Sequence, residues 1–101
     1  MSEVASGFQV DGERWALAGP LTMDSVAAVL AASTEAALPA SGVIDLERIE
    51  VVDSAGVALL LAWKRRAEAE RKPLAFAHLP PSLASLAQLY GVEELLVAEP
   101  I

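Results

Sequence analysis

Near the N-terminus the hydrophobic residues form two short runs, and after these runs they recur with the period of a helix. Apolar residues dominate positions 8–10 and 14–18, and Asp11-Gly12 lies between these two runs. Both turn residues tolerate a positive φ, so the pattern predicts a β-hairpin. Apolar and small residues then recur at helical spacing over residues 26–37, which predicts a helix with Thr22 as its N-cap.

The rest of the chain alternates short apolar runs with longer helical patterns. The expected elements are buried strands at 43–46 and 74–77, a connecting loop at 47–52, helices at 55–71 and 82–89, and a short element with a tail at 92–101. Pro80 and Pro81 suit the opening of the third helix, and Gly91 suits its end. A hairpin followed by β-α-β-α alternation predicts an α/β fold, with helices packed against a mixed sheet of about four strands.

Length and composition narrow the class of protein. A chain of 101 residues with 54% hydrophobic residues predicts one domain, residues 1–101, with its own core. The absence of cysteine excludes disulfide scaffolds and thiolate metal sites, and is compatible with the cytosol. A net charge of −7 argues against nucleic acid and anionic lipid as partners. The longest apolar run, residues 55–63, is too short for a membrane span, and no signal peptide is expected.

The residues that usually carry catalysis or bind metals form no recognisable constellation. His78 is the single histidine, and the acidic residues at 45, 47, 50 and 53 are typical of a solvated loop. Glycine-rich phosphate loops do not occur, and a nucleophile elbow around Ser54 would need glycine where Val52 stands. The sequence therefore predicts a protein that is not an enzyme, with no catalytic residue, no metal and no cofactor.

Residues 44–61 resemble the signature of the STAS domain family. That signature is a buried strand ending in Asp45-Leu46, a short loop, and then Asp53-Ser54-Ala55-Gly56-Val57 opening a helix. The family includes anti-sigma factor antagonists, the cytoplasmic tails of sulfate transporters and the MlaB-like subunits of bacterial phospholipid-trafficking ABC transporters. Residues 16–21 and 83–92 are similar to the MlaB-like members in particular, and the whole resemblance covers residues 16–96.

The resemblance implies a non-enzymatic STAS subunit that binds and supports an MlaF-like transporter ATPase. The complex would also contain permease and substrate-binding subunits, and would maintain outer-membrane lipid asymmetry by phospholipid transport. The subunit itself would be cytoplasmic and peripheral to the inner membrane, without direct membrane insertion. The alternative within the family is an anti-sigma factor antagonist that is regulated by phosphorylation of Ser54.

The candidate site lies at the start of the long helix. Ser54 is expected to act as the N-cap or as a phosphorylation site, Asp53 to hold the loop, and Gly56 to permit close backbone approach. The first two turns of this helix are apolar nearly all round, so either another helix of the domain or a partner protein covers the second side. The expected partner-binding residues are Ser54, Ala55, Gly56, Leu59, Trp63 and Arg66. On the third helix, Leu83, Leu86, Leu89 and Tyr90 are expected in the core.

Overall fold

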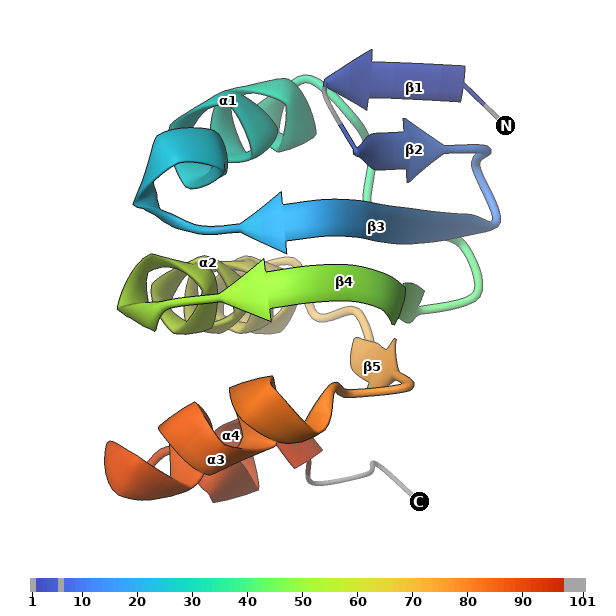
Figure 1. The fold of residues 1–101 in the computed structure, drawn as a ribbon. Coiled ribbons are helices and arrows are strands. Elements are labelled where there is room, and N and C mark those ends of the chain that lie inside the picture. Colours follow the sequence, from blue (N-terminus) through green and yellow to red (C-terminus); the bar gives the residue numbers. More distant parts are fainter. Residues whose placement is uncertain (1, 6, 98–101) are drawn as a thin grey trace.

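The computed structural model describes residues 2–5 and 7–97, which form one sheet and a set of helices (Figure 1). The elements in chain order are β1 (Ser2–Ala5), β2 (Phe8–Val10), β3 (Arg14–Leu21), α1 (Met23–Thr34), β4 (Val43–Val52), α2 (Ser54–Ala69), β5 (Ala75–Ala77), α3 (Pro81–Leu89) and α4 (Glu93–Val97). The predicted α/β class is confirmed. The predicted hairpin is also confirmed, with Gly12 in its turn at a φ of 88°.

The sheet has five strands in the order β1-β2-β3-β4-β5. Its first two pairings are antiparallel, whereas β3-β4 and β4-β5 are parallel, so the sheet is mixed as expected. β1 adds a fifth strand to the four that the sequence predicts. The parallel pairing of β3 with β4 brings their carboxyl ends to the same edge of the sheet, and α1 and α2 both begin there (Figure 1).

Helices cover one face of the sheet. Along β3 and β4, Trp15, Leu17, Ile44 and Leu46 are buried, whereas the intervening side chains, such as that of Asp45, are partly exposed on the other face. α2 packs against the buried face, with α1 on one side of it and α3 and α4 on the other (Figure 1). This alternation of buried and open positions is typical of a sheet with one covered face.

Three aromatic rings form the centre of the core. Trp63 of α2 stacks on Phe8 of β2 with ring centroids 5.9 Å apart, and meets Trp15 of β3 edge-on at 5.3 Å. Phe8 and Trp15 also meet edge-on, at 5.2 Å. The indole N–H of Trp63 donates to the Ser33 hydroxyl of α1 at 3.0 Å. The cluster therefore ties the hairpin, α1 and α2 together.

The prediction of a connecting loop at residues 47–52 is wrong, because β4 continues to Val52. Its backbone pairs with β3 as far as Leu21↔Val52, although the side chains of Glu47, Arg48 and Glu50 are exposed. Backbone hydrogen bonding to a neighbour can hold a strand whose side chains are polar. β3 likewise continues through the glycine and proline at 19–20, where the sequence predicts its end.

The predicted ends of the third helix are confirmed. Pro81 occupies its first turn, and Gly91 follows its end with a φ of 71°. The predicted element at 92–101 is the short helix α4, and residues 98–101 of that prediction lie outside the described residues.

Candidate functional site at the start of helix α2

Asp53 joins the two loops at the carboxyl ends of the parallel strands. It is the N-cap of α2, and its Oδ1 accepts the Ala55 N–H at 2.8 Å. Its Oδ2 accepts the N–H of Met23, the first residue of α1, at 3.0 Å. One carboxylate therefore holds both helix starts, which confirms the expected loop-structuring role of Asp53.

Ser54 is the first residue of α2 and is exposed. Its expected role as the N-cap is wrong, because the capping carboxylate belongs to Asp53. The Ser54 hydroxyl therefore does not cap the helix. It lies at the N-terminus of α2, which is the positive end of the helix dipole. Its phosphorylation and its contact with a partner stay predictions.

Gly56 lets α2 approach the end of β3. A Cβ atom at this position would lie 2.7 Å from the carbonyl oxygen of Leu21, which is closer than a real Cβ contact. The glycine is buried, so a side chain there has no alternative space. The expected close backbone approach is thereby confirmed.

We expect Gly56→Ala to lower the free energy of unfolding by about 1–3 kcal/mol. Alanine raises helix propensity by about 1 kcal/mol, but its methyl group must displace backbone rather than a flexible side chain. Urea unfolding followed by circular dichroism measures the change. Gln88→Ala, on the exposed side of α3, is the control and should stay within about 0.5 kcal/mol of the parent. A Gly56→Ala variant as stable as the parent would contradict the close approach.

Two large apolar side chains are exposed near the carboxyl ends of β3 and β4, where α1 and α2 begin. Met23 is 73% exposed and Val51 is 56% exposed, at the first residue of α1 and near the end of β4. Asp53 lies between these segments, and both of its oxygens are bound to backbone N–H groups. We call Met23, Val51 and Ser54 the strand-end surface. Its rigid frame and its apolar side chains suit contact with another protein.

Two of the expected partner-binding residues lie instead in the core. Leu59 is 2% exposed and Trp63 is 1% exposed, so the expectation that they present a surface to a partner is wrong. The other possibility that the sequence left open is confirmed, because helices of the same domain cover both sides of α2. Ala55 is half-buried and Gly56 is buried, so this part of α2 offers mainly Ser54 to a partner.

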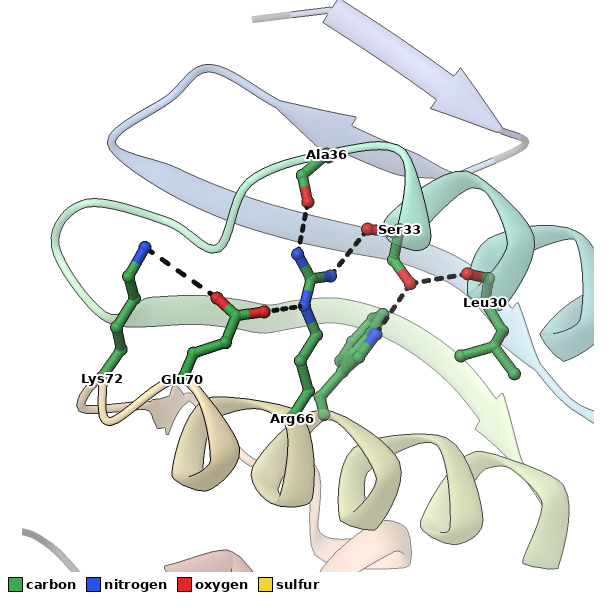
Figure 2. A network of polar contacts seen from close by, with 7 residues as sticks. Leu30, Ser33, Ala36, Arg66, Glu70 and Lys72 are labelled. Carbon is green, nitrogen blue, oxygen red and sulfur yellow. Dashed lines mark hydrogen bonds and ion pairs between the residues drawn. The ribbon is translucent and has the colours of Figure 1, made fainter.

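Arg66 bonds within the domain (Figure 2). Its guanidinium donates to the carbonyl oxygens of Ser33 at 2.8 Å and Ala36 at 2.7 Å, at the end of α1. It also pairs with Glu70 at 2.8 Å, and Lys72 lies 3.9 Å from the same carboxylate. The hydrogen bond from Arg66 lowers the pKa of Glu70. A cation at the end of α1 stabilises the free carbonyl groups there, so Arg66 has a structural role within the domain.

α3 exposes apolar side chains that the sequence analysis places in the core. Leu83 is fully buried and Leu86 is half-buried, as expected. Leu89 is 75% exposed and Tyr90 is 50% exposed, so their expected burial is wrong. Both residues lie at the end of α3, where the short helix leaves the core.

The described residues offer one group of side chains that could hold a metal ion, and it lies outside the strand-end surface. It consists of Asp45, Glu47 and His78. Partial burial acts to raise the pKa of Asp45, but hydrogen bonds from the Glu47 N–H and His78 outweigh it and hold the pKa below its ordinary value.

Within residues 2–5 and 7–97, no helix is long and apolar enough to cross a lipid bilayer.

Comparisons with known proteins agree with this architecture. The family model described as "Mlab, STAS domain" matches residues 6–98. The fold is similar to that of the anti-sigma factor antagonist SpoIIAA in its unphosphorylated form, with a TM-score of 0.59 and 27% sequence identity. That match covers 81% of this chain and 82% of the SpoIIAA chain. A comparison with curated proteins finds no match.

Proposed function

The chain belongs to the MlaB-type STAS domain family, and we propose that it is a non-enzymatic subunit that binds the ATPase of an ABC transporter. The observation that carries the proposal is the match of this branch of the family to residues 6–98. The transporter would move phospholipid and maintain outer-membrane lipid asymmetry. The subunit would be cytoplasmic and would reach the inner membrane only through the complex.

The strand-end surface supports this proposal as the place of contact. Met23 and Val51 expose apolar area that an ATPase subunit could bury, and Ser54 adds a hydroxyl that can donate or accept a hydrogen bond. Asp53 and Gly56 fix the frame, so little conformational entropy is lost when a partner binds. The exposed end of α3, with Leu89 and Tyr90, offers further contact area.

The subunit would act by binding linkage. A protein that binds one conformation of the ATPase more tightly shifts the population toward that conformation by its difference in affinity. Binding also stabilises the folded ATPase by mass action. Neither effect needs a catalytic residue in this chain.

A second function has specific support in the similarity to SpoIIAA. In this alternative the chain is an anti-sigma factor antagonist, and phosphorylation of Ser54 controls its partner. The exposed Ser54 hydroxyl supports this alternative, because the start of a helix stabilises a phosphate group.

Reconstitution of the ATPase, with and without this chain, tests the proposal. We expect no ATP hydrolysis by the chain alone, and a higher hydrolysis rate or melting temperature of the ATPase when the chain is added. Equal activity and equal stability in both preparations would contradict the proposed subunit role.

A matched pair of variants tests the contact surface in the same assay. Val51→Asp places a charge on the strand-end surface, and Leu95→Asp places one on α4 at a side chain of nearly equal exposure, 57% against 56%. Desolvation of an unpaired charge opposes binding, so Val51→Asp should lose the effect on the ATPase and Leu95→Asp should keep it. The reverse order would place the contact on α4.

A further inference from the structure

Strand pairing brings the single histidine of the chain to two carboxylates. Asp45 of β4 pairs with Ala77 of β5, and His78 follows directly. The His78 Nδ1 lies 3.1 Å from the Asp45 Oδ1. Glu47 comes two residues after Asp45 on β4, and one ligand atom from each of the three side chains lies within 4.8 Å of the others. The three side chains can therefore reach one point on the open face of the sheet.

These side chains are a donor set for a transition metal. Imidazole nitrogen together with carboxylate oxygen suits Zn²⁺ and related divalent ions, whereas Mg²⁺ and Ca²⁺ prefer oxygen alone. Two ligands that are each about 2.0–2.2 Å from a tetrahedral Zn²⁺ ion are about 3.3–3.6 Å from one another. The His78 Nδ1 and the Asp45 Oδ1 lie 3.1 Å apart, so a small outward shift of the exposed imidazole would admit the ion. Glu47 is exposed, so its side chain is free to turn inward and complete the set.

A backbone hydrogen bond orients one of the three ligands. The Asp45 Oδ1 accepts the Glu47 N–H at 2.9 Å, which orients the carboxylate on the strand. His78 adopts a left-handed conformation with a φ of 59°, which is uncommon for residues other than glycine. Arg14 lies 4.0 Å from the other oxygen of Asp45, and its side chain is 45% exposed, so it can turn away from an incoming cation.

A groove beside Asp45 and Glu47 leaves room for additional ligands. It has a volume of about 250 Å³ and is lined by these two residues together with Gln9, Ala16, Leu17, Ala18 and Arg48. Water or an external ligand in this groove could complete a four-coordinate site, as in zinc sites with three protein ligands.

We propose that Asp45, Glu47 and His78 form a binding site for Zn²⁺ or a similar divalent transition metal on the open face of the sheet. On β4 the nearest members of this site and of the strand-end surface are Glu47 and Val51, which are four residues apart, or about 13 Å along the strand. The site therefore shares no residue with the proposed ATPase contact.

Titration of the tag-free chain with Zn²⁺ tests the site. We expect one ion per chain by calorimetry, and a shift of the single imidazole in the NMR spectrum. His78→Asn and Asp45→Asn should each weaken the affinity at least about tenfold, since even the loss of a group that only orients a ligand costs that much. Asparagine tolerates the left-handed backbone at position 78, so this variant should keep its fold. Glu68→Gln, an exposed acid on α2, should bind like the parent.

Paramagnetic Ni²⁺ locates the ion directly, because it broadens the signals of nearby residues. Broadening confined to the amides around Asp45, Glu47 and His78 would support the site. Broadening spread over exposed acids such as Glu13 and Glu68, or unchanged Zn²⁺ affinity in His78→Asn, would overturn it. Displacement of Zn²⁺ by an equal concentration of Mg²⁺ would contradict the proposed preference for a transition metal.

Discussion

Trp63→Ala is expected to lower the free energy of unfolding by about 3–5 kcal/mol. The side chain is 1% exposed and packs against Phe8 and Trp15, so its removal leaves a cavity between the hairpin and α2. The substitution also removes the hydrogen bond that the Ser33 hydroxyl accepts from the indole N–H. Domains of this size are stable by about 5–15 kcal/mol, so the variant would lose a large part of its stability.

Urea unfolding of three variants measures this effect and its origin. Trp63→Phe keeps an aromatic ring and loses only the hydrogen bond and part of the volume, so it should cost less than Trp63→Ala. Leu89→Ala, at a side chain that is 75% exposed, should stay within about 0.5 kcal/mol of the parent. A Trp63→Ala variant that unfolds like the parent but loses its partner would place the indole on the surface.

Ser54→Asp is expected to fold normally and to bind the ATPase at least about thirtyfold more weakly, a cost on the order of 2 kcal/mol. Ser54 is exposed and does not cap α2, so neither Ser54→Asp nor Ser54→Ala should change stability by more than about 0.5 kcal/mol. The aspartate places a second charge beside Asp53, and binding must remove water from it. Ser54→Ala should keep more of the affinity than Ser54→Asp.

Ser41→Asp is the matched control, because it adds the same charge just before β4 begins, at the other end of that strand. It should bind the ATPase like the parent in calorimetry. Unchanged binding by Ser54→Asp would show that the start of α2 is outside the contact. If the chain is instead an anti-sigma factor antagonist, Ser54→Asp mimics its phosphorylated form and should release an anti-sigma factor. In that case the parent protein should not bind the ATPase.

Local backbone chemistry made much of the fold predictable. Asp11 and Gly12 form the hairpin turn, and the Asp11 carboxylate accepts the N–H groups of Glu13 and Arg14 at 2.8 Å. Pro81 and Gly91 bound α3 as their restricted and permissive backbones require. Such signals act over a few residues, so a single sequence contains them.

The length of β4 could not be predicted in the same way. Glu47, Arg48 and Glu50 interrupt the apolar run, and the register to β3 shifts between Ala16 and Ala18. What holds the second half of the strand is backbone pairing with a neighbour that is distant in sequence. Side-chain periodicity does not report that pairing.

The candidate site was only partly predictable, for the same reason. The Asp53 role follows from short-range geometry, because its carboxylate accepts the N–H of Ala55 two residues later. Gly56 was also identified from the sequence, but the backbone that it approaches is that of Leu21, 35 residues earlier. The wide apolar arc of α2 was visible in the sequence, but nothing in it indicated that α1 covers Trp63. His78 and Asp45 are 33 residues apart, and only the pairing of β4 with β5 brings them together.

The aromatic cluster makes folding and association optically separable. Trp15 and Trp63 are the two tryptophans of the chain, and both indoles lie in the same buried group with centroids 5.3 Å apart. Their emission and their near-ultraviolet dichroism report on one place, the junction of the hairpin with α2. A protein that docks on Met23, Val51 and Ser54 touches neither indole, since both are at most 1% exposed. Tryptophan fluorescence is therefore a probe of unfolding that stays silent during binding, and complex formation needs a label placed elsewhere.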